Sequence, residues 1–292
     1  MIVVLTALEI ERAAVLDRMT GAAVRAHRAG TLFHVGQLGR RRVALGLVGA
    51  GNAAAAAVAE RAVAEFSPAA MVFVGVAGGL RDWTRLGDVV VATKVYAYHG
   101  GRSTDAGMRS SPQAWTPSYR LLELARSVGR AGEWCAAVPA GGRPGVHFEP
   151  VASGEVVLDS RTSEVARWLH ENYTDAVAVE MESAGFALAG HLNDDLPVVS
   201  VRGVSDRAGG AKDVTDEAGW QPVAAGNAAA FAEALIAEIE DEDEDEEAPG
   251  GPAEEPRGFS NQNVANDHAR VGQQIGAVYG DLTVGSRRGD RK

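Results

Sequence analysis

Short apolar runs alternate with Ala-rich stretches of helical length over residues 1–238. The runs are almost continuously apolar, which is typical of strands that are buried on both faces of a sheet. The stretches between them repeat apolar residues at helical spacing. Strands are predicted at 2–5, 32–38, 42–48, 71–74, 88–96, 176–179 and 198–203, and helices at 9–19, 52–66, 118–128, 163–172, from about 181, and at 224–238.

This order of elements predicts an α/β domain with a mostly parallel or mixed central sheet. Ligands of such sheets bind beyond the carboxyl ends of the strands. Acids stand at these places: Glu9 and Glu11 after the first strand, Glu180 and Glu182 after the sixth, and Asp206 after the last. With no basic cluster and no His/Cys group beside them, they favour proton transfer and binding of sugar hydroxyls over phosphate or zinc chemistry.

The composition changes near residue 238, where an unbroken run of acids at 240–247 precedes a Pro/Gly segment at 248–257. Like charges repel and resist burial, which predicts a solvated linker. The chain is therefore expected to contain a catalytic domain at 1–238, a linker at 239–258 and a tail at 259–292. The net charge of −11 falls to about −3 without the acid run and says little about partners.

The overall composition excludes several classes of protein. Hydrophobic residues make up 46% and charged residues 23%, which suits a chain with a buried core. Its apolar runs fall short of the ~20 residues that cross a bilayer, and its start lacks the basic flank of a secretory signal. The single cysteine, Cys135, excludes an intrachain disulfide and suits a reducing cytoplasm. The sequence contains no basic patch with interleaved aromatics, which argues against nucleic-acid binding.

Five short motifs follow one another along the chain: GAGN at 49–52, GVAGG at 75–79, LGDVVV at 86–91, VEME at 179–182 and VRGVSD at 201–206. Together with TALEIE at 6–11, their order resembles the nucleoside phosphorylase superfamily, and most of all its methylthioadenosine/S-adenosylhomocysteine nucleosidase branch. The similarity covers roughly residues 1–238. It implies a three-layer α/β/α domain with a central mixed sheet, a homo-oligomer, and activity without a metal or organic cofactor.

The resemblance also implies cleavage of a purine N-glycosidic bond. Asp206 matches the family's acid, which protonates the departing base at N7; burial would keep it protonated by raising its pKa. Glu11 matches the residue that activates water, and Glu182 matches the carboxylate that accepts hydrogen bonds from the ribose 2′- and 3′-hydroxyls. Met181 matches a methionine that lies against the sugar, where an apolar side chain excludes water.

Further residues are expected around the base and the sugar. Residues 153–158 match the segment that holds the purine, but Val157 stands where the branch commonly places an aromatic ring, which leaves the identity of the base open. Val76 stands where many relatives have Ser or Thr. The predicted substrate-binding residues are Glu182, Met181, Val76, Ala77, Gly78, Val157, Leu158 and Ser205.

Each of these assignments has a purely structural alternative. Glu11 and Glu182 are acids in the first turn of a helix, which the helix dipole favours. Asp206 is also typical of a turn or an N-cap, and Met181 of a core. The motifs in register favour catalysis. Glu180 and Arg202 are expected to have structural roles, Arg202 as an ion-pair partner near the site.

Hydrolysis is favoured over phosphorolysis. In hexameric phosphorylases an Arg precedes the Gly-rich strand end, and Phe73 or Val74 stands there in this chain. The glycine-rich segments 49–51 and 75–79 still offer backbone N–H groups to an anion. Phosphorolysis and a catalytically silent nucleotide-binding sensor therefore remain alternatives. Residues 96–102, which include His99, are expected in a loop that either covers the site or lies on the surface.

The tail contains an uncharged, proline-free segment at 271–280 with two Gln residues and several β-formers. It resembles the amyloid-signalling motifs at the ends of some bacterial effector proteins, which implies self-assembly or a receptor partner in a defence or cell-death pathway. The substrate would then be an abundant nucleotide such as ATP or AMP. A disordered tail is an equal alternative.

Overall fold

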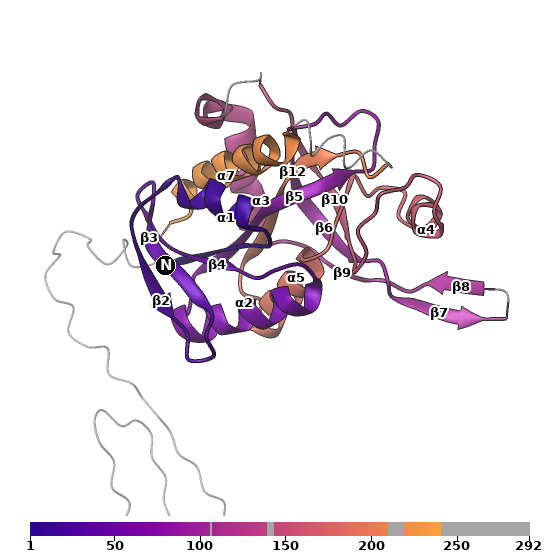
Figure 1. Cartoon of the computed structure of the whole chain (residues 1–292), viewed down its shortest axis with the longest axis horizontal. Helices are drawn as coiled ribbons and strands as arrows, with labels where there is room; N and C mark the ends of the chain where they lie inside the picture. Colours follow the sequence, from indigo (N-terminus) through magenta and orange to yellow (C-terminus); the bar gives the residue numbers. More distant parts are fainter. Residues whose placement is uncertain (106, 139–142, 210–218, 241–292) are drawn as a thin grey trace, which may run out of the picture. The chain divides into compact units, whose positions relative to one another are not determined.

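The computed structural model describes residues 1–105, 107–138, 143–209 and 219–240 (Figure 1). The chain divides into two units, Met1–Glu244 and Asp245–Lys292, and every described residue belongs to the first. Apart from residues 239 and 240, the predicted linker and tail lie outside the described residues. The predicted division of the chain stays a prediction.

Strands form the central layer of the first unit and helices lie on either side of it (Figure 1). The helices are α1 (Glu9–Leu16), α2 (Asn52–Phe66), α3 (Tyr119–Ala131), α4 (Glu164–Asn172), α5 (Ser183–Leu192) and α7 (Trp220–Glu238), with a short 3₁₀ helix η1 (Glu133–Ala137). The strands are β1 (Ile2–Thr6), β2 (Met19–Ala26), β3 (Leu32–Leu38), β4 (Arg41–Leu47), β5 (Ala70–Gly79), β6 (Val89–Ala97), β7 (Gly101–Thr104), β8 (Gly107–Ser110), β9 (Gln113–Trp115), β10 (Val146–Ser153), β11 (Ala178–Glu180) and β12 (Val198–Asp206).

The main sheet is mixed, with the strand order β11-β10-β6-β12-β5-β1-β4-β3-β2. β1 is parallel to both β4 and β5, and β12 is parallel to β5 but antiparallel to β6. β11 pairs in addition with β5, so the strands from β5 to β11 close into a ring. This closure brings the ends of β5, β11 and β12 together.

Two apolar cores attach the helices to opposite faces of the sheet. One core contains α1, α3 and α7, through residues such as Val15, Val128 and Phe231. The other contains α2 and α5, through residues such as Val58 and Phe186. The predicted three-layer α/β/α fold with a mixed sheet is therefore confirmed. None of the described helices has the length and apolar character needed to cross a membrane.

Several predicted elements are corrected by the structure. Helix α1 ends at Leu16, and the chain continues into β2, where Met19 is buried and the following residues are exposed. β10 was not predicted, because Glu149-Pro150 interrupts its apolar pattern at a bulge in the ladder. The polar stretch expected to be a loop after β6 contains the two-stranded ribbon β7–β8, and β9, which pairs with β6.

The glycine-rich segment 75–79 is the end of β5 and not a loop beyond it. Gly75 pairs with Arg202 of β12. A Cβ at position 75 would lie 2.6 Å from Arg202 Nη1 and 2.8 Å from Glu11 Oε1. Glycine is required there because the strand runs between two buried charged groups.

Candidate active site

A cavity of about 300 Å³ lies where the carboxyl ends of β5, β11 and β12 meet the start of α1. This is the place where ligands of α/β sheets bind. All ten residues predicted from the sequence to act in catalysis or substrate binding line this one cavity. The lining residues are Ala7, Leu8, Glu11, Ala50, Val76, Ala77, Gly78, Val156, Val157, Leu158, Val179, Glu180, Met181, Glu182, Ser205, Asp206 and Gln221.

Seven lining residues were not predicted as site residues. Six of them lie within the recognised motifs and segments: Ala7, Leu8, Ala50, Val156, Val179 and Glu180. Glu180 was expected to be structural. Gln221 comes from the first turn of α7, and no motif marks it. Only the fold therefore reveals it as a lining residue.

Glu11 is held at the start of α1 by backbone N–H groups. Its side chain is buried, and Oε2 accepts hydrogen bonds from the N–H of Ala7 at 2.7 Å and of Leu8 at 2.8 Å. Oε1 accepts one from the N–H of Val76 at 2.8 Å. Burial raises the pKa of Glu11, while Arg202 and the three N–H groups oppose that rise. A buried carboxyl group fixed in this way can take a proton from a bound water.

Glu182 directly precedes α5 and lines the cavity. Oε1 accepts a hydrogen bond from the N–H of Gly51, and Oε2 accepts one from Arg202 Nη1, each at 3.2 Å. Burial raises the pKa of Glu182 to about 7; Arg202 opposes this rise and the neighbouring Glu180 adds to it. The carboxyl group therefore changes charge near neutral pH.

Arg202 is a fully buried arginine that ties the acids together. Its guanidinium donates to both Glu180 and Glu182, and to Ser183 Oγ at 2.9 Å. It also lies over the ring of Phe73, with 4.3 Å between the guanidinium carbon and the ring centroid. Arg202 is not among the residues that line the cavity, so it acts on the site through the carboxylates that it holds.

Asp206 ends β12 and is 4% exposed. Its Oδ2 accepts a hydrogen bond from Ser205 Oγ at 3.0 Å, and its Oδ1 accepts one from the N–H of Ala208 at 2.7 Å. A Cβ at position 78 would lie 2.9 Å from Oδ1, so Gly78 makes room for the carboxyl group. The fold therefore brings an aspartate from the far end of the domain sequence into the cavity of Glu11 and Glu182.

The segment 153–158 is fixed to the helices by Asn52. The Asn52 amide donates to the carbonyl of Gly154 at 2.9 Å, and its oxygen accepts from Ser153 Oγ and from the N–H of Gly185, each at 2.9 Å. Beyond this anchor, Leu158 is buried and Val157 is 59% exposed. Val157 is therefore an aliphatic, open part of the cavity wall.

The charges of the cavity argue against an anionic nucleophile. Its described lining includes four acids and no Lys, Arg or His. Two N–H groups of the glycine-rich segments are already used, that of Gly51 by Glu182 and that of Val76 by Glu11.

Within the described part of the chain, no group of His, Cys, Asp and Glu could hold a metal ion. His99 is exposed and lies outside the catalytic cavity, and its Nδ1 accepts a hydrogen bond from the N–H of Glu155 at 3.1 Å.

Comparisons with known proteins point in one direction. The family model described as "Phosphorylase superfamily" matches residues 1–237. A 5'-methylthioadenosine/S-adenosylhomocysteine nucleosidase of Maridesulfovibrio salexigens is 30% identical over 179 residues, 60% of this chain and 72% of the relative. A nucleosidase of the same name from Colwellia psychrerythraea, solved with adenine, is 25% identical, with a TM-score of 0.70 over 81% of this chain and 94% of that one.

The futalosine hydrolase of Helicobacter pylori has the same fold. Its structure superposes with a TM-score of 0.69 over 82% of this chain and 97% of that one, at 22% identity. Two differently named hydrolases therefore have this fold. Similarity of fold does not by itself identify the substrate.

Proposed function

Because the chain belongs to the phosphorylase superfamily, which confirms the resemblance seen in its motifs, we propose that it hydrolyses the N-glycosidic bond of a purine nucleoside. The observation that carries this proposal is the convergence of Glu11, Glu182 and Asp206 on one cavity. The nucleosidase relatives support hydrolysis as the reaction.

Each of the three acids has a distinct task. Asp206 donates a proton to N7 of the purine as the bond between the base and C1′ breaks, which neutralises the departing base. Glu11 accepts a proton from the water whose oxygen bonds to C1′. Glu182 accepts hydrogen bonds from the ribose hydroxyls, and Met181 covers the sugar with an apolar side chain. The products are the free base and the free sugar.

The charge of the cavity favours a nucleoside with an uncharged 5′ group. The described lining contains four acids and no cation, and those acids that are ionised would repel a 5′-phosphate, and a triphosphate most of all. Val157 offers aliphatic packing to one face of the base in place of an aromatic ring. We therefore place neutral adenine nucleosides ahead of AMP and ATP as substrates.

Product analysis tests the proposed reaction. The purified full chain is incubated with methylthioadenosine, S-adenosylhomocysteine, futalosine, adenosine, AMP and ATP, and the free base is measured by chromatography with and without phosphate. Hydrolysis yields the free sugar in both conditions. A sugar 1-phosphate that forms only with phosphate would establish phosphorolysis, and binding without base release would establish a sensor.

We also propose that the tail segment 271–280, which lies outside the described residues, assembles and connects the hydrolase to a defence or cell-death response. The uncharged, proline-free sequence supports assembly. The test is peptide 259–284 with an amyloid dye, beside the full chain with and without Ile275→Pro. Persistent monomers with a coil signal would remove this part of the proposal. The homo-oligomer and the cytoplasmic location stay predictions.

A further inference from the structure

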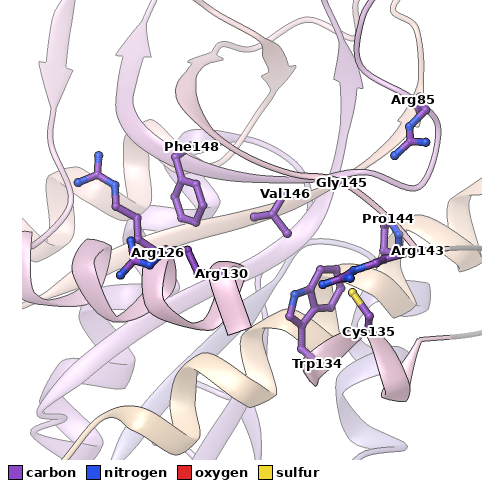
Figure 2. A pocket seen from close by; sticks show the side chains of 11 residues that line it. Arg85, Arg126, Arg130, Trp134, Cys135, Arg143, Pro144, Gly145, Val146 and Phe148 are labelled. Carbon is purple, nitrogen blue, oxygen red and sulfur yellow. The ribbon is translucent and has the colours of Figure 1, made fainter. Parts of the chain in front are cut away.

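A second cavity, of about 620 Å³, lies between α3, η1 and the start of β10 (Figure 2). It shares no lining residue with the catalytic cavity. β10 begins here with Val146 and ends at Ser153, shortly before Val156 of the catalytic cavity. The eight residues of β10 separate these ends by roughly 23 Å. The two cavities are therefore different places on the domain.

Four arginines line the second cavity, which we call the arginine cavity: Arg85, Arg126, Arg130 and Arg143. Its lining includes no Asp or Glu. Positive charges around a cavity, with no negative charge in its lining, attract an anion and raise its local concentration. This arrangement is the reverse of the catalytic cavity, and it occurs in a chain whose net charge is −11.

Two of these arginines are available to a ligand. Arg130 and Arg143 are exposed, and among the described residues neither has an ion-pair partner. Arg126 pairs with Glu123 at 2.6 Å, and both side chains are half-exposed. An exposed pair of this kind contributes at most about 1 kcal/mol and can be exchanged for a ligand. Arg85 reaches Asp88 at 3.4 Å, a long contact.

The arginines are distributed around an apolar floor. In Figure 2, Arg126 and Arg130 lie near Phe148, while Arg143 lies at the other end beside Trp134 and Cys135. Arg143 packs on Gly132, where the backbone is left-handed and a Cβ would collide with its guanidinium. Trp134 is buried and packs on Phe231 with 5.2 Å between ring centroids, which fixes the floor.

From this combination of cationic groups and an apolar floor, we propose that the arginine cavity binds a small molecule with a pyrophosphate group. Arginine binds phosphate oxygens through pairs of parallel N–H donors. Guanidinium groups at both ends of the cavity suit a ligand with at least two phosphates better than a single phosphate. The ligand is either inorganic or a nucleoside polyphosphate, whose base would contact Trp134 and Phe148. The proposal is independent of the reaction at the catalytic cavity.

Calorimetric titration of the full chain with inorganic pyrophosphate, and separately with ATP, tests the proposal. We expect saturable binding of one ligand per chain that weakens as salt is added. Arg130→Gln with Arg143→Gln should weaken it at least about tenfold. Arg28→Gln with Arg42→Gln is the matched control, because both residues are exposed, lie outside the cavity and carry the same charge; it should leave binding within about twofold. Tighter binding of ATP than of pyrophosphate, lost in Phe148→Ala, would identify a nucleotide; equal affinities would identify an inorganic ligand.

Three results would overturn the proposal. The first is no binding of either probe, and the second is equal binding by the double variant and the wild type. The third is competition by adenine, which would place the ligand in the catalytic cavity. If neither phosphate probe binds, binding of a peptide of sequence 240–247 would show that the cavity recognises carboxylates instead.

Discussion

Arg202 Nη1 lies 3.2 Å from Glu182 Oε2, and the same buried guanidinium donates to Glu180 through Nη2. Two buried carboxyl groups therefore share one buried cation. Because Arg202 lowers a pKa that burial raises, its charge determines how readily Glu182 releases its proton. The geometry of the proposed ribose site and the stability of the domain depend on the same residue.

Replacing Arg202 with Met should lower the free energy of unfolding by about 3–5 kcal/mol at pH 7, because Glu180 and Glu182 lose their shared cation. Urea denaturation measures this loss. Arg202→Lys keeps the charge but not the paired donors, and should lose less unfolding free energy than Arg202→Met. Arg28→Met, at an exposed arginine, is the control. Equal stabilities of Arg202→Met and the wild type would show that the pairing contributes nothing.

Glu182 should make the domain less stable as pH rises from 4.5 to 7. Its pKa is about 7 in the folded state and 4.5 in the ordinary state. The native state therefore binds more protons than the unfolded state in this range, and the unfolding free energy falls with pH. The shift corresponds to about 3 kcal/mol, present as a penalty above pH 7 and absent below pH 4.5.

Glu182→Gln should remove this part of the pH dependence. The unfolding free energy of the variant minus that of the wild type should rise by about 3 kcal/mol from pH 4.5 to pH 8. Denaturation at a series of pH values measures this difference. Glu11, whose pKa is also raised, adds a slope of the same sign in both proteins. Glu171→Gln, at an exposed position of α4, is the control. Parallel stability curves for Glu182→Gln and the wild type would contradict the raised pKa.

Glu11→Gln should damage both activity and stability. A glutamine side chain has one acceptor oxygen, so its NH₂ group would face either the N–H of Val76 or those of Ala7 and Leu8. We expect a loss of about 1–3 kcal/mol in unfolding free energy and about a hundredfold slower base release. Glu9→Gln is the matched control on the same helix, since Glu9 is 68% exposed. Similar rates for the two variants would rule out the role of Glu11.

Val157→Phe should tighten binding of purine nucleosides by restoring an aromatic surface for the base. Stacking contributes about 1–3 kcal/mol per base, which corresponds to a KM at least about fivefold lower. Val24→Phe is the control, because Val24 has nearly the same exposure, 60% against 59%, and lies on β2 away from the cavity. An unchanged or higher KM for Val157→Phe would show that the base does not lie against this residue.

The buried parallel strands were predictable because burial on both faces leaves an unbroken apolar run. β1, which is buried and parallel to both its neighbours, differs from its predicted bounds by one residue. The antiparallel strand β3 and the helix α2 have their predicted bounds. β2 was not predictable from this signal, since seven of its eight residues are exposed. β10 was not predicted because Pro150 interrupts its apolar run at the bulge. A pattern of hydrophobic residues cannot reveal a strand that is stabilised only by backbone hydrogen bonds to its neighbours.

The site was predictable where short motifs carry its residues. Glu11 and Glu182 follow the ends of β1 and β11 within five residues, and Asp206 ends β12. The closure of the sheet brings the ends of β5, β11 and β12 together at the cavity. Gln221 was not predictable, because only the packing of α7 brings it to the cavity. The arginine cavity was missed for the same reason: Arg85 and Arg143 are far from α3 in sequence, and no motif connects them.

The proposed reaction depends most on Asp206 as the proton donor, and Asp206→Asn tests this role most directly. Asparagine keeps the shape and the acceptor oxygen but cannot donate an acidic proton. Single-turnover release of base from a purine nucleoside should slow by about 10²–10⁴-fold, while the affinity for the nucleoside stays within about threefold of the wild type. Asp82→Asn, at an aspartate that is 82% exposed, should leave both unchanged. Base release by Asp206→Asn at the wild-type rate would contradict the central claim.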